Sequence, residues 1–209
     1  MRYKSRTEFV CQNLNKIKGF KKILDIGFVG NTDDEPFIHN KIKETISTTD
    51  FLLGIDINAD INQFKEQKNV KYRELSIYDL DGQKDLKSFF HAVVFCEVIE
   101  HLPFPYLAIE KISWALRTGG KLIITYPNPL GYRIFLSYLL KSKYWDPKFA
   151  KYFAGDPDHK VFPMPPSLVH FLNVYGFEVE ECAFPKGAFA GVPILEKFST
   201  YVGIVAKKI

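Results

Sequence analysis

Two carboxylates and two imidazoles stand where they could carry chemistry. Glu97, Glu100 and His101 lie within five positions, directly after the apolar run 92–96, and His159 lies in a polar turn further along the chain. Imidazoles exchange protons readily near neutral pH, so His101 and His159 are the predicted catalytic residues, as bases for an attacking hydroxyl. The alternatives are a helix-capping role for His101 and a solvated turn for His159.

The same cluster also has the donor set of a metal site. Two carboxylates and an imidazole in so short a stretch could bind Mg²⁺ or another divalent ion, with His159 as a distant fourth ligand. In the alternative, Glu100 and His101 are structural or line an acceptor pocket. Our prediction assigns no metal ligand, and the chelator sensitivity of an active preparation distinguishes the two cases.

Glycines and a carboxylate follow the first two apolar runs. The run 23–26 leads into Gly27 and Gly30, and the run 51–56 ends in Asp56. Glycines let a ligand approach the backbone closely, and the start of the next helix offers free N–H groups. A carboxylate at the end of the second strand can accept both hydroxyls of a ribose. Together these features indicate an adenosine-containing ligand, although each is common in α/β proteins.

Alternating segments must position these residues. Apolar runs predict parallel strands, buried on both faces, at 23–26, 51–56, 70–75, 92–96 and 121–126. Helical periodicity predicts helices at 7–17, 36–46, 104–117 and 167–175, the second starting at Pro36 behind Asp33 and Asp34, and Gly119 and Gly120 ending the third. The segments 177–184 and 200–206 fit an antiparallel hairpin. Because ligands bind beyond the carboxyl ends of such strands, the polar residues are expected to meet there.

An ordered series of motifs resembles the class I S-adenosylmethionine-dependent methyltransferases, especially their small-molecule branch. The matching segments are 23–27, 53–56, 97–102, 116–122 with 126–128, and 168–179 after His159. The resemblance spans about residues 20 to 183, with most of 128–160 outside it. It implies an α/β fold: a Rossmann-like, doubly wound, seven-stranded sheet in three α/β/α layers, mostly parallel with an antiparallel terminal strand.

The resemblance also implies a site for S-adenosylmethionine as cofactor. The residues assigned to it follow the first four strands: Asp25, Gly27, Gly30, Asp56, Ile57, Ser76, Ile77, Cys96 and Glu97. The first three would line the methionine part, the next two the ribose and the adenine edge, and the last two would close the site from the fourth strand. Ser76, followed by Ile77, stands where the family often has an acidic residue beside the adenine amino group, so that contact is expected to be weaker.

The first turn departs from the family pattern of Asp-x-Gly-x-Gly-x-Gly. Val29 occupies the position of the middle glycine and Asn31 that of the last. A β-branched residue does not comfortably adopt positive φ. Either Gly30 takes the role of the middle glycine, with the motif shifted by one residue, or the pocket is altered and binds the cofactor less well.

The predicted activity is that of a transferase. A methyl group passes from S-adenosylmethionine to an oxygen or nitrogen of a small-molecule acceptor by in-line displacement, which depends on alignment and exclusion of water. The alternatives are a degenerate, non-catalytic nucleotide-binding module, an RNA methyltransferase and an NAD-dependent dehydrogenase. The dehydrogenase is disfavoured because 27–30 lacks the Gly-x-Gly-x-x-Gly spacing.

The segment 129–162 breaks the alternation and gathers aromatic side chains among lysines. We predict a single domain over residues 1–209 in which this insertion forms a lid or acceptor site. Its rings could close over a hydrophobic acceptor, stack on nucleobases or lie against a membrane face, or simply pack on the sheet edge. The predicted partner is a small-molecule acceptor; nucleic acid and peripheral membrane contact are the alternatives.

Composition bounds these interpretations. A chain of 209 residues with 46% hydrophobic and 25% charged residues can build a core, which excludes a disordered chain. A net charge of +4 does not indicate a nucleic-acid binder. Three widely spaced cysteines and the absence of a secretory signal favour a cytoplasmic protein, and prolines and a glycine interrupt the apolar stretch 122–140. The oligomeric state stays open.

Overall fold

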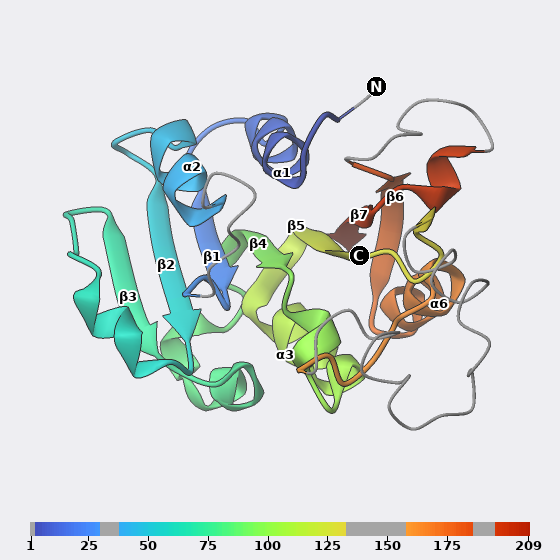
Figure 1. Ribbon diagram of the computed structural model, residues 1–209. Helices are drawn as coiled ribbons and strands as arrows, with labels where there is room; N and C mark the ends of the chain where they lie inside the picture. Colours follow the sequence, from blue (N-terminus) through green and yellow to red (C-terminus); the bar gives the residue numbers. More distant parts are fainter. Residues whose placement is uncertain (1–2, 30–37, 133–157, 186–194) are drawn as a thin grey trace.

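A seven-stranded sheet forms the centre of the molecule. The computed structural model describes residues 3–29, 38–132, 158–185 and 195–209 (Figure 1). The strands lie in the order β3-β2-β1-β4-β5-β7-β6, and β7 is antiparallel to both of its neighbours. Their bounds are β1 (Lys22–Ile26), β2 (Phe51–Asp56), β3 (Val70–Glu74), β4 (Phe90–Cys96), β5 (Leu116–Pro127), β6 (Phe177–Ala183) and β7 (Tyr201–Lys208). The predicted fold class and the predicted C-terminal hairpin are confirmed.

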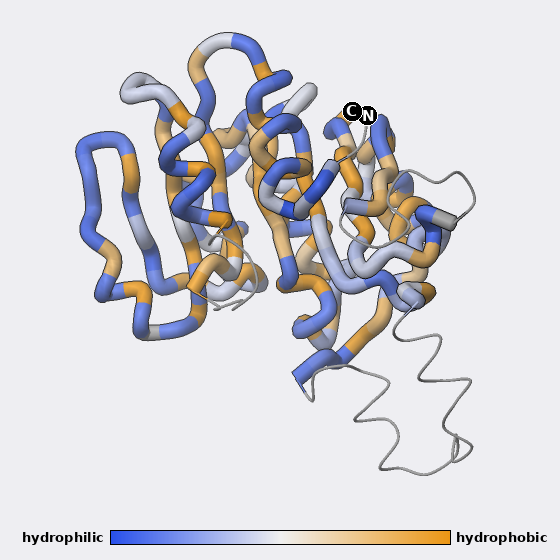
Figure 2. Tube along the Cα trace, turned by 45° about the horizontal axis from the view of Figure 1, so that its top comes forward, coloured by the Kyte–Doolittle hydropathy of each residue, from blue (hydrophilic) through white to orange (hydrophobic). Residues whose placement is uncertain are grey.

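Helices cover both faces of the sheet. α1 (Arg6–Asn15) and α2 (Ile38–Thr45) pack on one face, and α3 (Pro105–Ala115) and α6 (Pro165–Val174) pack on the other (Figure 1). The central strands are buried on both faces, which explains their almost unbroken apolar sequence (Figure 2). Two apolar clusters result, one on each side of the sheet.

The first helix begins with a reciprocal cap. The Ser5 side chain accepts a hydrogen bond from the Glu8 N–H at 3.0 Å, and the Glu8 carboxylate accepts one from the Lys4 N–H at 2.6 Å. Such a cap satisfies N–H groups that the first turn leaves without helical partners. It fixes Arg6 as the first residue of α1.

The predicted boundary between the third helix and the fifth strand is wrong. The helix expected to reach residue 117 ends at Ala115, and β5 begins at once with Leu116, which pairs with Phe90. The pairing register then shifts before Ala92, and Gly119 adopts φ +78° within this irregular start. Strand pairing therefore takes residues that helical periodicity assigned to α3. The predicted caps of the second helix, Asp33 and Asp34 before Pro36, lie outside the described residues, and so does most of the segment 129–162.

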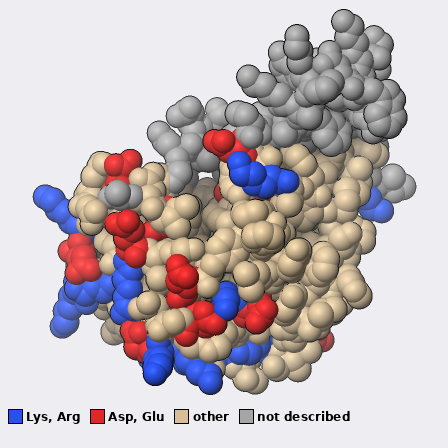
Figure 3. Space-filling view, turned by 90° about the horizontal axis from the view of Figure 1, so that it is seen from below, with Lys and Arg blue, Asp and Glu red and all other residues tan. Residues whose placement is uncertain are grey.

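The parallel strands end at a common edge of the sheet. Seen from below, on the side of α3 and α6, the described surface shows a small hollow above its centre and carries intermixed acidic and basic side chains over one half (Figure 3). The strand order reverses between β1 and β4, and a crevice at such a switch point is where open α/β sheets bind ligands. In the part of the chain that the structure describes, no helix combines the length and apolar character needed to cross a membrane.

Candidate active site

Polar side chains collect where β1, β4 and β5 reach the carboxyl edge. Asp25 pairs with Val94 across β1 and β4, and Cys96 pairs with Thr125 across β4 and β5. Since alternate residues of a strand share a face, Asp25, Cys96 and Thr125 all lie on the face that α1 and α2 cover. Burial raises the pKa of the Cys96 thiol, and the carboxylates of Asp25 and Glu97 raise it further, so this cysteine is no nucleophile.

Asp25 is held by a histidine that sequence reasoning missed. The Nδ1 atom of His39, on α2, lies 2.7 Å from Oδ2 of Asp25, and its Nε2 atom lies 3.1 Å from the Tyr72 hydroxyl. Phe28 stacks on the imidazole with ring centroids 4.3 Å apart. Burial raises the pKa of Asp25, and His39 opposes that effect. The sequence signal that could have identified His39 was its helical spacing, because it lies three positions before Ile42 and shares a helical face with it.

The first turn needs its first glycine. Gly27 has φ +71°, and a Cβ atom there would lie 2.4 Å from a methyl group of Val98. Its N–H donates to the Ile55 carbonyl at 2.9 Å. Val29 does not adopt positive φ, since Ser88 and Glu97 are the non-glycine residues that do so among those described. Val29 therefore avoids the conformation that is uncomfortable for a β-branched residue. The predicted ligand residue Gly30 lies outside the described residues.

Asp56 ends β2 and ties two loops together. Its Oδ2 accepts a hydrogen bond from the Val29 N–H and its Oδ1 accepts one from the Asn58 N–H, both at 2.9 Å. Each carboxylate oxygen has a second acceptor position, so both bonds are compatible with a bound ribose. Ile57 beside it is 74% exposed, an unusual state for a large apolar side chain and one that suits the edge of an adenine.

The residues after β3 have structural roles as well. The Ser76 hydroxyl accepts a hydrogen bond from the Tyr78 N–H at 3.2 Å and caps the short helix 77–82. The Ile77 side chain is buried in the apolar cluster on the α3 side of the sheet. Only backbone atoms of Ile77 are therefore available to a ligand.

Glu97 closes the end of β4 through an ion pair. Its Oε2 lies 2.8 Å from Nη1 of Arg6, and its Oε1 accepts a hydrogen bond from the Thr125 hydroxyl at 2.9 Å. The Arg6 guanidinium lies over the Tyr201 ring, 4.1 Å from the centroid. Glu97 itself has φ +56°, and its N–H donates to the Thr125 carbonyl at 2.8 Å. Sequence reasoning included Glu97 but missed Arg6, whose partner is 91 positions away.

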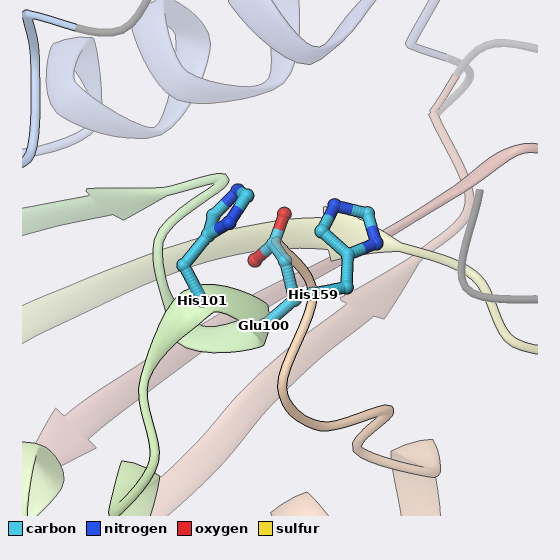
Figure 4. A group of neighbouring side chains, drawn as sticks. All are labelled: Glu100, His101 and His159. Atoms are coloured by element: carbon cyan, nitrogen blue, oxygen red, sulfur yellow. The ribbon is translucent and has the colours of Figure 1, made fainter. Parts of the chain in front are cut away.

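The two predicted catalytic histidines lie next to each other. The ring centroids of His101 and His159 are 4.8 Å apart, and Glu100 lies between them (Figure 4). The Glu100 carbonyl accepts hydrogen bonds from the N–H groups of Lys160 at 2.7 Å and Val161 at 3.1 Å. These bonds join the segment after His159 to the turn after β4. Two segments far apart in the sequence thereby form one cluster.

The cluster is a partial match to the metal site considered above. Ligand atoms of Glu100, His101 and His159 all lie within 4.8 Å of one another. A carboxylate with two imidazoles is a donor set that divalent transition metals accept. Glu97 is not part of this gathered set; its carboxylate pairs instead with Arg6 and Thr125. The four-residue set is therefore not assembled.

An apolar groove adjoins the histidines. It lies between α3 and α6, has a volume of about 420 Å³ and is lined mainly by aliphatic and aromatic side chains, among them Ile99, Tyr106 and Phe171. Phe162 also lines it and contacts the His159 ring, with centroids 5.7 Å apart. Phe162 is therefore shared by the groove and the histidine cluster. A cavity of this size accepts a ring system or a short aliphatic chain.

Comparison with known proteins finds similar O-methyltransferases. No family model matches the chain. Ubiquinone biosynthesis O-methyltransferases of Alkalilimnicola ehrlichii and Pseudomonas entomophila are each 26% identical to it, over 129 and 172 residues. Those matches cover 59% and 77% of this chain. The chain spans only 48% and 66% of the length of these two relatives.

Comparison with solved structures identifies the fold. A SAM-dependent methyltransferase from Archaeoglobus fulgidus superimposes with a TM-score of 0.64 at 19% identity, covering 97% of this chain and 94% of that one. The chain has the fold of the class I S-adenosylmethionine-dependent methyltransferases. The N-methyltransferase NodS from Bradyrhizobium japonicum, solved with S-adenosyl-L-homocysteine, gives a TM-score of 0.60 at 13% identity, with 97% and 85% covered. In this methyltransferase fold the edge occupied by Asp25, Asp56 and Glu97 is the ligand-binding edge.

Proposed function

We propose that this chain is a methyltransferase that transfers the methyl group of S-adenosylmethionine to an oxygen or nitrogen of a small-molecule acceptor. One observation carries the proposal: the acidic strand ends and the two histidines converge at the carboxyl edge of a methyltransferase fold. The named O-methyltransferase relatives support the reaction class, and NodS with its bound product supports the cofactor.

The residues present fit the cofactor. Gly27 gives the turn after β1 its left-handed conformation, Asp56 keeps acceptor positions for ribose hydroxyls, and the exposed Ile57 offers an apolar surface to the base. When bound, S-adenosylmethionine supplies a methyl group activated by its sulfonium. The protein needs to align the acceptor with that group and to exclude water.

The histidines supply the proton acceptor. A neutral imidazole of His101 or His159 takes the proton from an acceptor hydroxyl as the oxygen attacks the methyl carbon. Glu100, buried between the two rings, can compensate the positive charge of an imidazole that has taken up a proton (Figure 4). The cluster can therefore accept a proton and retain it until product leaves.

The groove between α3 and α6 supplies the acceptor side. Its apolar lining favours an acceptor with a ring or a short aliphatic body. The polar atom of that acceptor would face the histidines, beside Phe162. The predicted lid, 129–162, is a further candidate for this surface. Screening small phenols, amines and carboxylic acids with labelled S-adenosylmethionine tests the proposal. Transfer to at least one class supports it, and labelled RNA as the only product would move the protein to the RNA methyltransferases.

A metal-assisted version of the same reaction is the second candidate. The gathering of Glu100, His101 and His159 within ligand distance favours it, and the engagement of Glu97 by Arg6 opposes it. We infer that the reaction proceeds without a metal. An active preparation treated with a chelator and desalted is expected to keep its rate, and a loss restored by Mg²⁺ or Zn²⁺ would contradict this.

A further inference from the structure

His39 is a buried side chain that the proposed mechanism does not use. It lies on α2 and is 1% exposed, with Phe28 stacked on its ring. Its two ring nitrogens face partners on two different strands: Asp25 on β1 at 2.7 Å and Tyr72 on β3 at 3.1 Å. Because both nitrogens are engaged and the ring is buried, the orientation of the imidazole is fixed.

The chemistry of these partners determines the direction of both hydrogen bonds. An ionised carboxylate can only accept, so Nδ1 of His39 carries a proton and donates a hydrogen bond to Asp25. In the neutral imidazole Nε2 is then an acceptor, and the Tyr72 hydroxyl donates to it. Burial raises the pKa of Tyr72, and the charges of Asp25 and Glu66 raise it further, so this hydroxyl keeps its proton at neutral pH. The result is a chain of hydrogen bonds from β3 through α2 to Oδ2 of Asp25.

Three aromatic rings enclose the imidazole. The centroids of Phe28, Tyr72 and Phe64 lie 4.3, 5.5 and 6.1 Å from that of His39. Gly54 on β2 makes this packing possible, because a Cβ atom there would lie 2.6 Å from the Phe28 ring. Phe28 belongs to the turn that follows β1, so the imidazole contacts this turn as well as the Asp25 carboxylate. His39 therefore holds two parts of the segment that is predicted to line the methionine part of the cofactor.

Asp25 gives this arrangement a purpose beyond packing. The carboxylate is 3% exposed, and burying a charge is costly unless partners compensate it. Burial raises the pKa of Asp25, and the hydrogen bond from His39 opposes that rise, which favours the charged form. Stability alone is a weak reason for such a buried pair, because apolar side chains of similar volume often serve equally well. A buried, oriented negative charge is suited to a cationic group of a ligand.

The amino-acid end of S-adenosylmethionine carries such a group, its α-ammonium. We propose that His39 is a positioning residue for the cofactor: its hydrogen bond orients the Asp25 carboxylate and keeps it charged for the α-ammonium. Oδ2 of Asp25 faces His39, and carboxylate oxygens have further acceptor positions for a ligand. The assignment of Asp25 to the cofactor comes from the family resemblance, whereas its dependence on His39 follows from the structure. The inference rests on the proposed function, and it adds α2 and β3 to the predicted cofactor site.

A pair of variants of the same shape isolates the hydrogen bond. Asparagine and leucine both lack the imidazole, but only asparagine can donate to Asp25 from near the position of Nδ1. S-Adenosylhomocysteine carries the α-ammonium, whereas 5′-methylthioadenosine keeps the adenosine and the thioether and lacks it. Calorimetry is expected to show that His39→Leu weakens S-adenosylhomocysteine binding about 10- to 100-fold and that His39→Asn stays within about 3-fold of wild type. Neither variant should change 5′-methylthioadenosine binding more than about 2-fold. His170→Leu, at an exposed position on α6, is the matched control and should change the binding of neither ligand.

The remaining outcomes overturn the inference in distinguishable ways. Equal weakening of S-adenosylhomocysteine binding by both variants, or no weakening by either, would show that the hydrogen bond to Asp25 does not matter. Equal weakening of both ligands would make His39 a purely structural residue. Wild-type protein that binds neither ligand would overturn the proposed function together with this inference. Should His39→Leu fail to fold, Tyr72→Phe removes only the distal hydroxyl and is expected to weaken S-adenosylhomocysteine binding alone, about 2- to 5-fold; an unselective loss or no loss there would count against His39.

Discussion

At the scale of single residues, the central prediction concerns the two histidines. His101→Ala and His159→Ala should each lower kcat by about 10²- to 10⁴-fold, the usual contribution of a general base, without changing the affinity for S-adenosylhomocysteine. His170→Ala is the matched control, since that histidine is exposed on α6. Rates within threefold of wild type in both catalytic variants would exclude these imidazoles as bases.

Gly27 permits a second prediction, because the chain contains its own control. Gly27→Ala combines positive φ with a collision against Val98, whereas Gly19→Ala has φ +76° and open space around the new methyl group. Gly19→Ala should cost about 1–2 kcal/mol of unfolding free energy, the cost of the left-handed backbone alone. Gly27→Ala should cost more and should also weaken S-adenosylhomocysteine binding, as measured by chemical denaturation and calorimetry.

The site residues differ in how far the sequence could predict them. Asp25, Asp56 and Glu97 follow apolar runs directly, so local pattern placed them at the carboxyl edge. Arg6 and His39 lie on helices, and their roles come from side chains that the sequence separates by 91 and 14 positions. Only the three-dimensional packing of α1 and α2 on the sheet brings them to those carboxylates.

At the scale of elements, Asp50 joins the beginnings of β1 and β2. This buried carboxylate accepts hydrogen bonds from the N–H groups of Lys21 at 2.7 Å and Ser47 at 2.9 Å, and the Lys21 ammonium lies 3.3 Å away. Burial acts to raise the pKa of Asp50, but the hydrogen bonds from Ser47 and Lys21 and the Lys21 charge outweigh it, so the pKa lies below its usual value.

A lowered pKa makes the contribution of Asp50 depend on pH. The stabilisation is present above the unfolded-state pKa of about 3.9 and is lost as the pH falls through the lower folded-state pKa. Asp50→Asn should therefore destabilise the protein at pH 7, and the difference from wild type should shrink below about pH 3.9. Urea denaturation across this range measures it. A difference that grew towards acid pH would contradict the assignment.

Element boundaries show where sequence reasoning fails. Apolar runs located β1 to β5 and a hairpin pattern located β6 and β7; the signal is strongest in β1, β2 and β4, which are almost wholly buried. The end of α3 was misplaced because Leu116 satisfies helical periodicity and also pairs with Phe90 of β4. Propensity cannot choose between these states, since the pairing partner at Phe90 is remote in the sequence.

At the scale of the whole molecule, strand order explains the site. The switch between β1 and β4 opens the crevice, and the insertion of antiparallel β7 between β5 and β6 brings Tyr201 beside Arg6. The order of motifs predicted the sheet. It did not predict that the chain's first helix would reach the same edge.

Binding of the product should stabilise the whole fold. A ligand at 100 times its dissociation constant adds about 2.7 kcal/mol of stability, which for a domain of this size raises Tm by roughly 5–10 °C. Differential scanning calorimetry with S-adenosylhomocysteine measures the shift. An unchanged Tm at that ligand concentration would contradict binding.

Direct binding to wild-type protein tests the central claim. Isothermal titration calorimetry with S-adenosylmethionine, S-adenosylhomocysteine and NAD separates a methyltransferase from a dehydrogenase and from a module without cofactor. We expect both sulfur nucleotides to bind at one site per chain and NAD to give no heat of binding. Binding of NAD alone, or no binding of either sulfur nucleotide at millimolar concentration, would contradict the proposed function.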